Sequence, residues 1–244
     1  MKQQQSGHEP EDKEKNMDKM RDLAYYNGKI TAIDDMMIPA NDRGFYFGDG
    51  IYEAAMVFDH KIFALQDHLD RMFNSAAMLR IELPYTKEEV GALLTDLVQK
   101  LESSCQFLYW QVTRGTSPRN HLFPGEGVSS NLYVYSKPWS GVQMCDEYRL
   151  ISIPDTRFYH CNIKTLNLIP NVMAAQQASE AGCNETVFVR DGFVTECSHS
   201  NISMVKDGVF ITHPLDNLIL PGTERKHIIR YCGELGIPVE ERAF

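Results

Sequence analysis

The chain has 244 residues, of which 43% are hydrophobic and 23% charged, a balance typical of a globular protein with a sizeable core. The formal net charge of −9 argues against binding to a nucleic-acid backbone, because a negative surface repels phosphates. No apolar run is long enough to span a bilayer and the first residues lack the apolar core of a signal peptide, so we expect a cytoplasmic protein. Its histidines form no H-E-x-x-H pattern, so we expect no metal site.

Taken in chain order, the elements begin with residues 1–22, whose polar composition predicts a disordered tail. Asn27-Gly28 between two apolar runs indicates a hairpin, and Thr86 with Glu89 forms a capping box at the start of a helix that continues to residue 101. Hydrophobic patterns predict the other helices at 66–82, about 169–182 and about 223–235. They predict strands at 51–58, 107–113, 132–136, 148–153, 186–190, 201–205, 208–212 and from 237.

Helices and strands alternate without a regular βαβ repeat, which predicts an α+β or mixed α/β fold. Pro138 and Gly141 indicate a linker between a small α/β domain at 23–138 and a larger domain at 139–244. The last residues, GIPVEERAF, resemble a strand with nothing after it. We therefore expect either a truncated product or an edge that another chain covers.

Lys164 lies in HCNIKTLNLIPN, among apolar and small polar residues. Burial in such surroundings lowers the pKa of a lysine, and the neutral amine can form a Schiff base with an aldehyde cofactor. The alternative is a surface lysine whose alkyl stem packs on apolar neighbours, which is the more common case for a lone lysine.

Three other segments carry groups that could bind a pyridine nitrogen or a phosphate. Glu196 in GFVTECSHSNIS precedes a cluster of hydroxyl residues, and it could keep a pyridine nitrogen protonated or simply cap a turn. Gly222 and Thr223 open a predicted helix whose free N–H groups suit a phosphate, although many such helices bind nothing. Arg71 could add a bidentate charge to the same phosphate or lie on a solvated helix face.

Arg119 and His121 lie in TRGTSPRNHLFP, a loop constrained by glycine and prolines. Cations on such a loop suit the capture of a substrate carboxylate. An exposed basic loop without a function is the competing interpretation.

In this order the segments resemble the fold-type IV enzymes that use pyridoxal 5'-phosphate (PLP), a family of branched-chain aminotransferases, D-amino acid aminotransferases and aminodeoxychorismate lyases. The matching stretches cover nearly all of residues 24–244: YYNGKI, DRGFYFGDGIYEA, FALQDHLDRMFNSA, YWQVTRGTSPRNHLFP, IKTLNLIPNVMAAQQASEAGCNE, VTECSHSNIS and THPLDNLILPGTERK. The Arg-x-His pair within SPRNH makes the resemblance greatest to D-amino acid (D-alanine) aminotransferases, because the other members lack it.

The resemblance implies a two-domain fold and a role for each candidate residue. Lys164 corresponds to the lysine that binds PLP, and Glu196 to the carboxylate that pairs with the pyridine nitrogen. The groups that bind the phosphate correspond to Arg71, Gly222 and Thr223. The hydroxyl-rich loop beside the ring corresponds to Ser198, His199 and Ser200. The substrate-carboxylate trap corresponds to Tyr52, Arg119 and His121, and its Arg/His loop reaches the neighbouring subunit's site, which implies a homodimer.

The reaction implied is transamination between a D-amino acid, of the D-alanine type, and 2-oxoglutarate, in which Lys164 moves the Cα proton. Relatives continue past position 244 with a segment that completes the larger domain, so we expect that domain to be incomplete. Three alternatives remain: an aminodeoxychorismate lyase, which eliminates pyruvate; a branched-chain aminotransferase, which prefers L-leucine; and an inactive fragment that still binds PLP.

Overall fold

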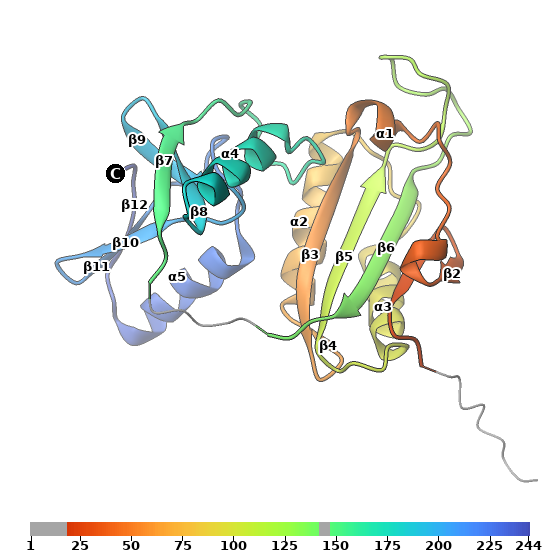
Figure 1. Ribbon diagram of the computed structural model, residues 1–244, viewed down its shortest axis with the longest axis horizontal. Helices are drawn as coiled ribbons and strands as arrows, with labels where there is room; N and C mark the ends of the chain where they lie inside the picture. The colour runs from red at the N-terminus through yellow and green to blue at the C-terminus, as the bar shows by residue number, and fades with distance from the viewer. Residues whose placement is uncertain (1–18, 142–146) are drawn as a thin grey trace, which may run out of the picture.

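The computed structural model describes residues 19–141 and 147–244, and it confirms the mixed α/β class. Figure 1 shows two units side by side: one contains β1–β6 with α1–α3, and the other contains β7–β12 with α4 and α5. Most of the tail predicted for residues 1–22 lies outside the described residues. The placement of the domain boundary near residue 138 stays a prediction.

The first unit is built on a six-stranded antiparallel sheet in the order β2-β1-β6-β5-β3-β4. Its strands are β1 (Leu23–Tyr26), β2 (Lys29–Thr31), β3 (Gly50–Phe58), β4 (Lys61–Ile62), β5 (Gln106–Thr113) and β6 (Asn131–Pro138). The predicted hairpin is confirmed, because Asn27 and Gly28 join β1 to β2 with φ of 44° and 96°. Two successive positive φ values match the twist of the paired strands.

One face of this sheet carries the core. The helices α2 (Leu65–Met78) and α3 (Lys87–Gln99) lie on that face, behind the strands in Figure 1. The buried residues alternate along the strands, as the pleat requires, and include Ile51, Ala55, Val57, Leu108, Trp110 and Val112. The capping box at the start of α3 is confirmed by both of its hydrogen bonds.

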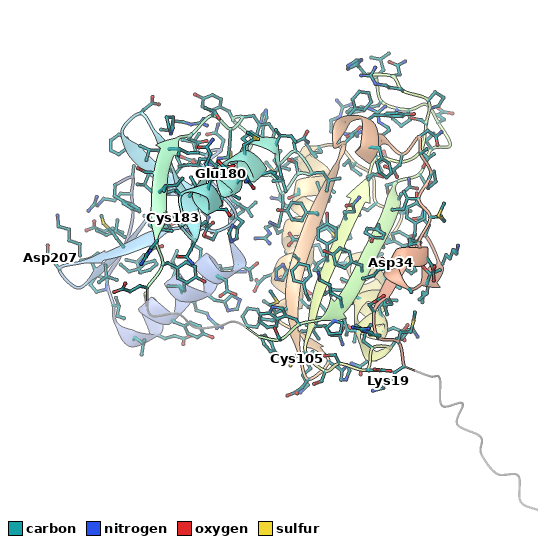
Figure 2. All side chains as sticks on the ribbon, viewed as in Figure 1. Lys19, Asp34, Cys105, Glu180, Cys183 and Asp207 are labelled. Carbon is teal, nitrogen blue, oxygen red and sulfur yellow. The ribbon has the colours of Figure 1, made fainter. Side chains whose placement is uncertain are left out.

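The second unit contains two three-stranded sheets, in the orders β7-β8-β9 and β10-β11-β12. Its strands are β7 (Leu150–Pro154), β8 (Glu185–Arg190), β9 (Phe193–Cys197), β10 (Ser203–Lys206), β11 (Val209–Thr212) and β12 (Val239–Glu241). The helices are α4 (Ile169–Glu180) and α5 (Thr223–Leu235), close to their predicted bounds. Asp207 lies at the tip of the β10–β11 hairpin, at the outer end of this unit (Figure 2).

Several predictions from sequence were wrong in detail. Residues 20–22 are ordered, because Met20 hydrogen-bonds the backbone of Lys100 and Glu102. Helix α2 ends at Met78 and not at residue 82, because Arg80 adopts φ 55°, through which an α-helix cannot continue. Two short helices, η1 (Ile33–Asp35) and α1 (Arg43–Phe47), were not predicted.

Strand β9 was missed although it carries Glu196. The signal was present: Asp191 and Gly192 join β8 to β9 with positive φ, and Asp-Gly is a strong hairpin dipeptide. The last strand, β12, pairs in parallel with β11. In the part of the chain that the structure describes, no helix is both long and apolar enough to cross a membrane.

Candidate active site

The segment that carries Lys164 is joined to the edge of β3. The Tyr52 N–H donates to Lys164 O at 2.9 Å, and the Leu166 N–H donates to Gly50 O at 3.1 Å. These two hydrogen bonds attach the second unit to the first at the position of the candidate lysine. A Cβ at Gly50 would lie 2.5 Å from the backbone oxygen of Val112 in β5 and 2.8 Å from Leu166 Cδ1, so this position requires glycine.

The Lys164 amine lies in a partly buried position between the two units. Its Nζ is 4.3 Å from the centroid of the Tyr52 ring, a cation–π distance. Burial, with the charge of Arg71, lowers the pKa of Lys164 to about 8, against the opposing effect of Glu53 and Glu196. A lowered pKa increases the fraction of the amine that is neutral at a given pH, and only the neutral amine attacks a carbonyl.

Arg71 is held by an ion pair with Glu53, a residue that sequence reasoning missed. Arg71 Nε and Nη2 each donate to a different oxygen of Glu53 at 2.7 Å, and His68 Nδ1 lies 2.8 Å from Glu53 Oε2. Burial alone would raise the pKa of the Glu53 carboxyl, but the hydrogen bonds from Arg71 and His68 hold it below its usual value. Arg71 Nη1 also donates to Pro221 O at 3.0 Å, which places the guanidinium beside the start of α5.

A cleft of about 470 Å³ opens where Arg71 meets the start of α5, and Gly222, Thr223 and Lys226 also line it. The N-cap residue of α5 is Gly222, which has no side chain to cap the helix, so the first N–H groups of α5 suit an anion. A Cβ at Gly222 would lie 2.0 Å from Asn201 Oδ1, so a larger residue there would displace the Asn201 amide that donates to Glu196. The cleft is not purely basic, because three carboxylates line it as well: Asp67, Asp70 and Glu241.

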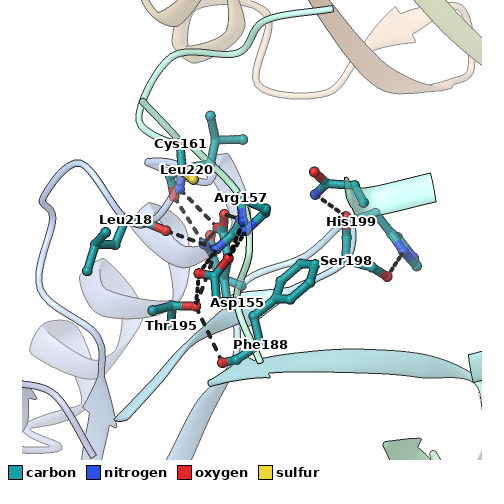
Figure 3. Close-up of polar contacts among 12 residues, drawn as sticks. Asp155, Arg157, Cys161, Phe188, Thr195, Ser198, His199, Leu218 and Leu220 are labelled. Carbon is teal, nitrogen blue, oxygen red and sulfur yellow. Dashed lines mark hydrogen bonds and ion pairs between the residues drawn. The ribbon is translucent and has the colours of Figure 1, made fainter. Parts of the chain in front are cut away.

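Glu196 is buried on β9 and bonds with both of its carboxylate oxygens. Oε1 pairs with Arg157, and Oε2 accepts hydrogen bonds from Asn201 Nδ2 and the Leu220 N–H, each at 2.9 Å. Burial raises the pKa of Glu196, and Arg157 opposes that rise. Figure 3 shows Arg157 among its partners, with Asp155 beside it.

The loop of Ser198, His199 and Ser200 follows β9 and is tied to Glu185, a second residue that sequence reasoning missed. Ser200 Oγ donates to Glu185 Oε2 and the His199 N–H donates to Oε1, both at 2.9 Å. The Ser198 carbonyl accepts a hydrogen bond from Asn171 of α4 at 2.7 Å. In Figure 3 the labelled Ser198 and His199 lie apart from the Arg157 cluster.

The structure brings Tyr52 to Lys164, but it does not bring Arg119 and His121 there. Both residues are exposed on the loop between β5 and β6 and contact Phe47. The Arg119 guanidinium lies 5.1 Å and the His121 ring 5.2 Å from the Phe47 ring centroid. Their predicted contribution to a neighbouring subunit's site therefore stays a prediction.

The residues present fit a phosphorylated pyridine aldehyde. Lys164 supplies an amine of lowered pKa, and the buried Glu196 supplies a carboxylate for a ring N–H. Arg71 and the uncapped start of α5 supply donors for a phosphate.

The chain is similar to known proteins in sequence and in fold. The family described as Amino-transferase class IV matches residues 50–244. A D-alanine aminotransferase of Listeria monocytogenes is 41% identical over 223 residues, which are 89% of this chain and 77% of that protein.

Among solved structures, the branched-chain amino acid aminotransferase from Escherichia coli matches with a TM-score of 0.80 and 21% identity, covering 92% of this chain and 77% of that one. A fold IV transaminase from Curtobacterium pusillum matches with a TM-score of 0.76 and 24% identity, covering 92% and 83%. At such identities these two matches establish the fold alone.

This chain belongs to the class IV aminotransferase family, and it is therefore an aminotransferase. The family implies PLP as the cofactor, with amino acids and 2-oxo acids as substrates.

Proposed function

We propose that the protein is a PLP-dependent D-amino acid aminotransferase of the D-alanine type, with 2-oxoglutarate as the amino acceptor. The observation that carries the proposal is the placement of the Lys164 amine, with its lowered pKa, near both Arg71 and Glu196. The preference for D-alanine rests on the 41% identity to a D-alanine aminotransferase and on the Arg-x-His pair at 119–121.

When bound, PLP supplies an aldehyde that exchanges amines and a ring that takes up electron density from the substrate. In this proposal the Lys164 amine would hold PLP covalently through its aldehyde and, when free, would carry the proton that leaves the substrate Cα. Glu196 accepts a hydrogen bond from the ring N–H and so holds a proton on that nitrogen. Arg71, Gly222 and Thr223 bind the phosphate.

The residues beside the ring and the carboxylate trap complete the proposed site. Ser198, His199 and Ser200 lie beside the ring on the loop that Glu185 holds. Tyr52 binds the substrate carboxylate from its own subunit, while the exposed Arg119 and His121 reach the site of the second copy. The protein is therefore proposed to act as a homodimer, because one chain does not assemble the trap.

The test is an assay with D-alanine and 2-oxoglutarate in the presence of PLP. We expect pyruvate and glutamate in equal amounts, a higher rate with D-alanine than with L-leucine, and no activity in Lys164→Ala. Faster turnover of L-leucine would identify a branched-chain aminotransferase, and pyruvate released from aminodeoxychorismate without an acceptor would identify the lyase. Protein that binds PLP through Lys164 but turns over none of these substrates would be the inactive fragment.

A further inference from the structure

Arg157 lies between two buried carboxylates, and each nitrogen of its guanidinium donates to one of them or to a neighbouring group. Its Nε donates to Asp155 Oδ1 at 3.0 Å and its Nη2 donates to Asp155 Oδ2 at 2.9 Å. Its Nη1 pairs with Glu196 Oε1, and Figure 3 shows Asp155 beside Arg157 in the same cluster. The side chains of Asp155 and Arg157 are 0% and 4% exposed, so water does not screen the pair.

The orientation of the Glu196 carboxylate is set from both sides. Oε1 faces Arg157, whereas Oε2 faces the Leu220 N–H and the Asn201 amide. Arg157 and Lys164 favour the anion. Three further ionisable side chains interact electrostatically with Glu196: Tyr52, Cys161 and Cys197. Burial favours the neutral acid, so Arg157 is the main charge that offsets burial.

We propose that Arg157 is a positioning residue of the active site: it holds Glu196 as an anion in one orientation, ready to accept a hydrogen bond from the cofactor's ring N–H. Asp155 in turn fixes Arg157, because the two-point contact leaves the guanidinium a single orientation. This role rests on the proposed function of Glu196. A neutral Glu196 would no longer favour the protonated ring nitrogen, and the ring would withdraw electrons less strongly.

Arg190 provides a matched control from the same cluster. Arg190 Nη2 lies 3.1 Å from Asp155 Oδ1 and donates to Arg157 O at 2.7 Å, and the guanidinium also lies 4.5 Å from the Tyr159 ring centroid. Its side chain is 8% exposed, so its loss disturbs a comparable buried network. Arg157 pairs directly with Glu196, whereas these contacts of Arg190 do not include that carboxylate. A purely structural role would make the two substitutions equivalent.

The first measurement is infrared difference spectroscopy of cofactor-free protein at about pH 7, each variant being compared with the same variant carrying Glu196→Gln. We expect an ionised Glu196 in the wild type and in Arg190→Gln, a neutral carboxylic acid in Arg157→Gln, and a return of the anion in Arg157→Lys. If Arg157→Gln does not fold, the double variant Arg157→Gln with Asp155→Asn replaces it in the measurement, because that variant loses one charge of each sign. We expect a neutral Glu196 there too.

The second measurement compares the dissociation constant of PLP with that of 1-deazapyridoxal 5'-phosphate, in which a C–H group replaces the ring nitrogen. The ratio of the analogue's dissociation constant to that of PLP measures the preference for PLP. We expect this ratio to fall about tenfold in Arg157→Gln, the effect of losing one hydrogen bond to a charged group, and to stay unchanged in Arg190→Gln. An anionic Glu196 and an unchanged preference without Arg157 would overturn the proposal. The infrared measurement needs no cofactor, so it decides the role of Arg157 even if D-alanine turnover fails.

Discussion

Replacing Lys164 with methionine should stabilise the cofactor-free protein. The amine is charged in the unfolded chain below its usual pKa of 10.5, but the folded structure lowers that pKa to about 8, chiefly by burial. Each pKa unit corresponds to about 1.4 kcal/mol, so at pH 7 the charged amine destabilises the fold by at most about 3 kcal/mol. The part of the side chain that remains exposed to water reduces this figure.

The pH dependence of stability distinguishes the removal of a buried charge from the gain that burying the apolar methionine side chain would bring at any pH. Below pH 8 both states hold the proton, and the cost of the buried charge is fully present. Between pH 8 and 10.5 only the unfolded state holds it, so the stability of the wild type rises with pH, and above 10.5 the cost is gone. The advantage of Lys164→Met is therefore largest at pH 7 and shrinks toward pH 10.5.

The assay is urea unfolding of both proteins at pH 7 and near pH 10.5, with the free energy of unfolding extrapolated to zero denaturant. Lys29→Met, at an exposed position in β2, is the matched control for replacing a lysine with methionine. If Lys164→Met brings the same stability change at both pH values, the amine is not held in a desolvated position and the reasoning is refuted.

Two other predictions concern the exposed Arg119 and the ion pair between Arg71 and Glu53. If Arg119 acts in the second copy, mixing Arg119→Met subunits with Lys164→Ala subunits should restore D-alanine turnover. The reason is that the mixed dimer has one site with both an intact lysine and an intact arginine. If turnover is not restored, Arg119 belongs to its own subunit's site or to no site. Glu53→Gln leaves the guanidinium of Arg71 without its counter-charge, which should destabilise the protein by about 3 kcal/mol in urea unfolding. The double variant with Arg71→Gln should regain part of that loss, and a single-variant effect below about 1 kcal/mol would contradict the pairing.

Local features of the chain could be predicted because they depend on residues close in sequence. Asn27-Gly28 specified a hairpin through its positive φ values, and Thr86 with Glu89 specified a helix start through two short-range hydrogen bonds. The mixed α/β class followed from the order of such elements. The signals that were overlooked were also local, since the Asp-Gly dipeptide at 191–192 marked the hairpin that leads into β9.

Tertiary structure alone decided which distant groups meet. Glu53 is 15 residues from His68 and 18 from Arg71, and no local pattern indicates that the three share one ion-pair network. Arg157 is 39 residues from Glu196, and Lys164 reaches the edge of β3 more than a hundred residues earlier in the chain. The physical reason is that a buried charge is stable only beside a partner, and folding supplies that partner from wherever the packed elements bring the chain together.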